Sequence, residues 1–290
     1  MRGRGYVVGM LAVGLLLSGC AGRTDGQDAP GDSTVGWDVG EPTGLIGSWT
    51  VTGLDGAEPI LRLAPDDLSV FEDCGVRLGQ WRAHPDGLFV ASVSGGLATS
   101  RSAGGECAGE TETPDWLARV TGFRTDGDQR VLLDEQDQQV ARLRPGARPS
   151  APPEMSAEQA APPVVTDQAR RDLGPVKELP AALTAPARDA VLGRWAPADG
   201  ARGGPRAAHV ELRADGDWRG SDGCNGQGGR WVLGSGGAFL ASSGPSTLIG
   251  CDNVPVGSWL DGARRIGLDG AVLVLFDAQG AETARLHRAS

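Results

Sequence analysis

The chain has 290 residues, of which 40% are apolar and 22% are charged, a balance typical of a globular protein with about two domains. Its net charge is −10, and an acidic chain without a basic stripe is repelled by phosphate, so nucleic acid is excluded as an expected partner. The abundance of glycine (46) and proline (19) favours short strands and turns over long helices.

The N-terminus has the organisation of a bacterial lipoprotein signal. Two arginines precede the apolar residues 6–17, a stretch too short to span a bilayer comfortably, and the run Leu17-Ser18-Gly19-Cys20 follows. This run resembles a lipobox, which implies removal of residues 1–19 and attachment of acyl chains such as palmitate to Cys20. We therefore expect a lipid-anchored protein on the extracytoplasmic face of the cell membrane. The alternative is an ordinary secretory signal with an incidental cysteine.

The rest of the chain divides into two similar domains and two connecting segments. Residues 20–43 predict a flexible tether, and residues 145–189, rich in proline and alanine, predict a semi-extended linker. Residues 44–144 and 190–290 share landmarks in the same order, among them the pairs Trp49/Trp195, Cys74/Cys224 and Trp81/Trp231. We interpret the two domains as copies of one unit, a tandem repeat.

Each copy predicts several short strands, one helix and two closing strands. The helix is expected over residues 114–123 in the first copy and over residues 255–265 in the second. The apolar run 271–276 and the alternating residues 284–287 predict the last two strands. The predicted fold class is mainly β with one short helix per domain (α+β), forming two small antiparallel barrel-like domains.

The four cysteines that remain after Cys20 occur as two per copy, at equivalent positions. Outside the cytosol they predict one disulfide within each copy, Cys74–Cys107 and Cys224–Cys251, because each copy must fold alone. The alternative is a redox-active or metal-binding thiol pair. The sequence contains neither a C-x-x-C motif nor clustered histidines, so we expect no metal and no cofactor.

The second copy carries a series of short motifs in a characteristic order: Leu192-Gly193-x-Trp195, Gly223-Cys224-Asn225, Thr247-x-x-x-Cys251 and Leu273-x-Leu275-x-Asp277-x-x-Gly280. Over residues 190–290 this order resembles the META (HslJ-like) domain. The first copy resembles a degenerate version, in which Gly75 replaces Asn225. The resemblance implies a small barrel-like fold in bacterial envelope lipoproteins, some linked to heat or antibiotic stress, and it implies no established catalytic residues.

Two side chains are candidates for contact with a ligand. Asn225 lies in a glycine-rich turn, where its amide either faces a ligand or bonds the local backbone. Trp218 has no evident counterpart in the first copy, so we expect it to be exposed, whereas the repeated tryptophans are expected in the cores. The three histidines, His84, His209 and His287, are scattered and expected at the surface.

These features predict a lipoprotein that is not an enzyme and that binds an envelope protein or a small ligand, with a role in the envelope stress response. One alternative is a small-ligand carrier that uses the mouth of a barrel. Another is a hydrolase or isomerase with a site between the two copies, which only the paired acidic turns support.

Overall fold

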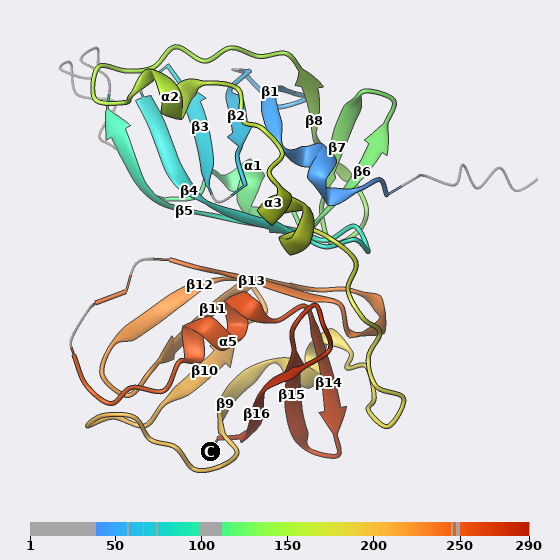
Figure 1. The fold of residues 1–290 in the computed structure, drawn as a ribbon, viewed down its shortest axis with the longest axis vertical. Coiled ribbons are helices and arrows are strands. Elements are labelled where there is room, and N and C mark those ends of the chain that lie inside the picture. The colour runs from blue at the N-terminus through green and yellow to red at the C-terminus, as the bar shows by residue number, and fades with distance from the viewer. Residues whose placement is uncertain are drawn as a thin grey trace, which may run out of the picture. The chain divides into compact units, whose positions relative to one another are not determined.

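The computed structural model describes residues 39–56, 58–65, 67–73, 75–98, 112–244, 246–247 and 250–289. All of them belong to one compact unit, which contains two eight-stranded antiparallel sheets (Figure 1). The two sheets correspond to the two copies of the repeat and confirm the predicted fold class. No helix within the described ranges is long and apolar enough to cross a membrane.

The first sheet, blue to green in Figure 1, consists of β1 (Gly47–Thr52), β2 (Ile60–Leu63), β3 (Leu68–Glu72), β4 (Gly75–Ala83), β5 (Phe89–Ala98), β6 (Gly122–Asp126), β7 (Gln129–Leu133) and β8 (Gln139–Pro145). Its strand order is β5-β4-β3-β2-β1-β8-β7-β6. The outer strands meet at one end, where the Phe89 N–H donates to the Thr121 carbonyl at 2.9 Å. The sheet therefore curls into a barrel that is closed at this end.

The second sheet, yellow to red, repeats this arrangement with β9 (Gly193–Pro197), β10 (His209–Leu212), β11 (Asp217–Ser221), β12 (Gly226–Leu233), β13 (Phe239–Ser243), β14 (Arg265–Asp269), β15 (Val272–Phe276) and β16 (Glu282–Arg288). Its order, β13-β12-β11-β10-β9-β16-β15-β14, is the same order shifted by eight strands. The Phe239 N–H donates to the Arg264 carbonyl at 2.9 Å, the counterpart of the Phe89 bond.

Both expected helices exist, but they are shorter than predicted. α1 (Asp115–Ala118) contacts β5, and α5 (Val256–Gly262) contacts β13. The prediction that they reach residues 123 and 265 is wrong, because β6 begins at Gly122 and β14 begins at Arg265. The residues expected to end the two helices, Phe123 and Arg265, instead lie at the start of a strand.

The repeated tryptophans lie in the two cores, as expected. Trp81 stacks on Phe89 with ring centroids 6.0 Å apart, and Trp231 stacks on Phe239 at 6.3 Å. Each indole N–H is satisfied by a backbone carbonyl, as in the bond from Trp81 Nε1 to the Ala64 oxygen at 2.6 Å. The same aromatic pair therefore anchors the same strands in each copy.

The linker between the copies is packed against them. A short helix, α2 (Ala157–Ala160), begins with a capping box formed by Ser156 and Gln159, and Met155 and Ala160 pack on Phe71 and Val76. A second helix, α3 (Asp167–Asp172), is capped by Thr166. A third, α4 (Arg188–Val191), leads into β9. The first half of the linker thus covers the first sheet.

Candidate functional site

The glycine-rich turn after β11 begins at Asp222 and is shaped by close backbone contacts. Gly223 has φ +102°, a conformation that other residues rarely adopt. A Cβ atom at Gly223 would also collide with the backbone of Arg202 and Gly204. Glycine is therefore required here, because another loop crosses directly over the turn.

The Asp222 carboxylate is the centre of this turn. Only 1% of the residue is exposed, and its oxygens accept hydrogen bonds from the Cys224 N–H at 2.8 Å and the Asn225 N–H at 2.5 Å. Side-chain amides donate as well, from Asn225 at 3.0 Å and Asn253 at 2.9 Å. Burial raises the pKa of Asp222, but these hydrogen bonds outweigh it and hold the pKa well below its ordinary value. The residue is a buried carboxylate stabilised by amides.

Asn225 contributes to this network with both ends of its side chain. Its amide nitrogen donates to Asp222, and its amide oxygen accepts from the Thr247 hydroxyl at 2.8 Å. The residue is buried, with 4% exposed. Of the two roles considered for Asn225, the geometry matches hydrogen bonding within the turn, and a ligand would have to displace these bonds to reach it.

The predicted disulfide of the second copy is confirmed, because Cys224 and Cys251 are bonded. Gly204 lies directly against the two sulfurs and leaves no room for a side chain there. The other predicted disulfide, Cys74–Cys107, and the lipidation site, Cys20, lie outside the described residues.

Trp218 is not exposed, so the expectation for this residue is wrong. Its exposed fraction is 0%, and its Nε1 donates to the Ser242 carbonyl at 2.9 Å. On β11 it pairs with Gly229 of β12, where a Cβ would approach the indole nitrogen to 2.9 Å. A Cβ at Gly229 would collide first with the Ser242 carbonyl oxygen, so the close approach of β13 already requires glycine there. The ring of Trp218 belongs to the second core.

The first copy treats the equivalent turn differently. Glu72, the counterpart of Asp222 at an offset of 150 residues, accepts a hydrogen bond from Arg77 Nε at 2.7 Å. The counterpart of Arg77 is Gln227, which donates weakly to Asp222 at 3.5 Å. The first copy therefore satisfies this carboxylate with a charged pair, and the second copy satisfies it with amides.

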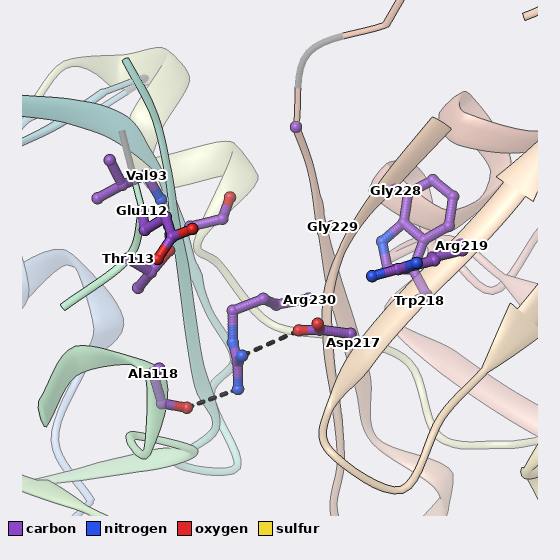
Figure 2. Close-up of a pocket in the computed structure, with 12 residues that line it drawn as sticks. Val93, Glu112, Thr113, Ala118, Asp217, Trp218, Arg219, Gly228, Gly229 and Arg230 are labelled. Carbon is purple, nitrogen blue, oxygen red and sulfur yellow. Dashed lines mark hydrogen bonds and ion pairs between the residues drawn. The ribbon is translucent and has the colours of Figure 1, made fainter. Parts of the chain in front are cut away.

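A cleft of about 440 Å³ lies between the two copies (Figure 2). We call it the interdomain cleft. Its polar lining residues are Ser92, Glu112 and Thr113 of the first copy and Asp217, Arg219 and Arg230 of the second. Gly228, Gly229 and Gly244 also line it and add no side chains to the space.

Arg230 bridges the two copies inside the interdomain cleft. It donates to Asp217 Oδ1 at 3.0 Å and to the Ala118 carbonyl at 2.5 Å, and both interactions are drawn as dashed lines in Figure 2. Burial lowers its pKa, and the Asp217 carboxylate opposes that effect, so the guanidinium stays charged. Glu112 and Arg219, by contrast, are exposed and form no ion pair with any residue that the structure describes.

The histidines do not gather into a site. His84 is buried, with 0% exposed, so the expectation of a surface position is wrong for it. Within the described ranges, no group of histidine, cysteine and carboxylate side chains could hold a metal ion. Sequence reasoning also missed the cleft residues, because only the packing of the two copies brings Glu112 near Arg219 and Arg230.

Comparisons of the chain with protein-family models, with curated proteins and with solved structures find no match. Function must therefore be argued from the residues themselves.

Proposed function

We propose that this chain is a lipid-anchored extracytoplasmic binding protein without catalytic activity, and that a polar segment of an envelope protein docks in the interdomain cleft. The lipobox at Cys20 supports the anchor, and the two META-like copies supply the binding platform. A role in envelope stress is the expectation that the resemblance carries.

The residues that first suggested a catalytic function are all bonded to other residues within the fold. Cys224 is held in a disulfide, Asp222 is surrounded by amide donors, and the Asn225 side chain is bonded at both ends. A nucleophile or general base needs a free and accessible functional group, and these three groups are bonded and largely buried. This is why a binding role fits the turn better than a catalytic one.

The observation that carries the proposal is the pair of free charges at the interdomain cleft. Arg219 and Glu112 are opposite in sign, exposed, and without an ion pair among the described residues, whereas Arg230 is already held by Asp217. Polar and charged groups around a cleft select a partner of complementary charge. A peptide segment that carries both an acidic and a basic side chain can form ion pairs with both Arg219 and Glu112.

The anchor and the docking site are tested separately. Cys20→Ala should move the protein from the membrane fraction to the soluble fraction, and retention at the membrane would refute the lipid anchor. For the docking site, a photoreactive residue replaces Thr113 or Ala118 in intact cells; both line the cleft and leave the Arg219 and Glu112 charges in place. We expect the same adduct from both positions and none from the control position Glu211, an exposed residue on β10. Equal adducts from Glu211 would refute the site.

A small-ligand carrier is the second candidate, and the size of the interdomain cleft favours it. About 440 Å³ lies within the range of small-molecule sites, roughly 300–1,000 Å³. Such a carrier would use the junction of the copies, since large side chains such as Trp195, Trp231 and Phe239 fill the second core. Native mass spectrometry of the protein released from cells distinguishes the carrier from the peptide-binding protein, because a carrier retains a small molecule of defined mass.

A further inference from the structure

The two copies meet through the same face of each sheet. β5 of the first copy contacts β12 and β13 of the second, and β13 contacts β4 and β5. Because β4 and β5 are the counterparts of β12 and β13, each contact recurs with the roles of the copies exchanged. This is the pattern of a two-fold interface between identical subunits.

The apolar centre of this interface shows the same two-fold relation between equivalent residues. Val90, Val232 and Leu240 form one buried cluster, with Leu88 packed against it. Val90 and Leu240 are equivalent positions, 150 residues apart, and their exposed fractions are 1% and 0%. Ser92 and Ser242 are a second equivalent pair, and both are buried.

One ion pair at the margin of the interface has no symmetric counterpart. Asp86 of the first copy pairs with Arg265 of the second at 2.9 Å, beside the buried His84. At the positions equivalent to His84 and Asp86, the second copy has Gly234 and Gly236. The margin therefore favours the pairing of the first copy with the second.

The two faces also differ at one central position. Arg82 of the first copy lies near Asp261 of the second and lowers its pKa, against the effect of burial. Its equivalent in the second copy is the apolar Val232, and the equivalent of Asp261 in the first copy is Ala118. Two first-copy faces would therefore leave Arg82 without its carboxylate. Two second-copy faces would bring valine and leucine together, and Asp261, although it would lose Arg82, would keep the Ser243 hydroxyl at 2.9 Å and Arg264 of its own copy as partners.

We infer that the second-copy face formed by Val232, Leu240 and Ser242 is self-complementary, and that it pairs with the same face of a second chain when the first copy is displaced. In the intact chain the linker holds the first copy at an effective concentration on the order of 1 mM, so the pairing within the chain dominates. This inference does not depend on the ligand or partner of the interdomain cleft.

The test uses the full chain with Cys20→Ala, which prevents lipidation, in sedimentation experiments up to about 1 mM, the concentration that the linker supplies. We expect the mass of one chain for this parent protein. Adding Asp86→Arg and Val90→Asp, which place a like charge against Arg265 and a carboxylate in the apolar cluster, should double the mass. Adding Leu240→Asp as well should restore the mass of one chain. Val164→Asp, at an exposed linker position, is the control and stays monomeric.

Because Val90→Asp could also unfold the first copy, Asp86→Arg is measured alone as well. The Asp86 side chain is 38% exposed, so the fold tolerates the longer residue while the contact with Arg265 is lost. It should raise the dimer fraction above that of the parent protein. If both variants stay monomeric over the whole range, or if the dimer survives Leu240→Asp, the proposal is overturned.

Discussion

Asn253 donates a hydrogen bond to the Asp222 carboxylate at 2.9 Å, although 31 residues separate the two in sequence. The Val254 N–H reaches the same residue and donates to the Asp222 carbonyl at 2.9 Å. Together with the Cys224–Cys251 disulfide, these bonds fasten the segment before α5 to the end of β11. The glycine-rich turn is thus a junction of the fold, and this role explains its cysteine and its aspartate.

Replacing Asp222 by alanine should destabilise the protein by about 3–5 kcal/mol, because it leaves several buried amide donors unpaired. Urea denaturation followed by tryptophan fluorescence measures this loss. The matched control is Glu211→Ala, which removes an exposed carboxylate from the same copy and should change stability by about 0.5 kcal/mol or less. Similar losses for the two variants would contradict the assigned role of Asp222.

His84 should make the protein less stable in mild acid. Burial lowers its pKa to about 4, Asp86 opposes this, and Arg265 and Arg264 reinforce it. Between its ordinary pKa of 6.5 and about 4, the unfolded chain binds a proton that the folded chain does not, so stability falls as pH falls. We expect a loss of about 2 kcal/mol between neutral pH and about pH 5.

The control for this effect is His84→Gln, which should remove most of the slope in that pH range. Asp222 does not interfere, because a carboxyl with a lowered pKa loses its stabilising effect only below its unfolded value of 3.8. An unchanged slope in His84→Gln would show that another group titrates there.

Breaking the confirmed disulfide with Cys224→Ser and Cys251→Ser should cost about 3.5 kcal/mol in the chain-entropy model, since the bridge closes a loop with a sequence separation of 27. Thermal unfolding measures this loss of stability.

Peptide mapping without reduction tests the remaining prediction, a Cys74–Cys107 link. Crossed links between the copies would refute the pairing deduced from the repeat.

Trp218 and Arg219 are neighbours on β11 with opposite environments, and they offer a matched comparison. Trp218→Ala removes a ring from the second core and should cost about 3–5 kcal/mol. Arg219→Ala removes an exposed side chain and should cost about 0.5 kcal/mol or less. Denaturation of the two variants measures both values, and a small loss for Trp218→Ala would contradict its place in the core.

The sequence predicted the features that depend on local pattern and on the repeat. Trp81 and Trp231 recur with the same spacing from a cysteine, and burial on the core face of a strand follows from that recurrence. Trp218 was misjudged because its counterpart, Leu68, is a different residue type, although both are buried at the same strand position. The glycine opposite, Gly229, is no signal for the ring, because Leu68 also faces a glycine, Gly79; the signal that identifies the buried position is the apolar residue at the same strand position in both copies.

The interdomain cleft could not be predicted from the sequence, and the reason is physical. Glu112 precedes α1 in the first copy, and Arg219 and Arg230 lie on strands of the second. Their proximity depends on which faces of the two sheets pack together, and that choice is made by contacts such as Asp86 with Arg265. Side chains of this kind show no periodicity or spacing that reveals the pairing.

The most direct test of the proposed function is charge reversal at the interdomain cleft in intact cells. A photoreactive residue at Ala118, an uncharged lining residue, reports on the partner, and Arg219→Glu is introduced into the same chain. We predict that the adduct is lost while membrane attachment and unfolding midpoint stay unchanged, because Arg219 is exposed and has no ion pair to break among the described residues. An adduct that persists at its original yield would contradict the claim that the cleft binds the partner.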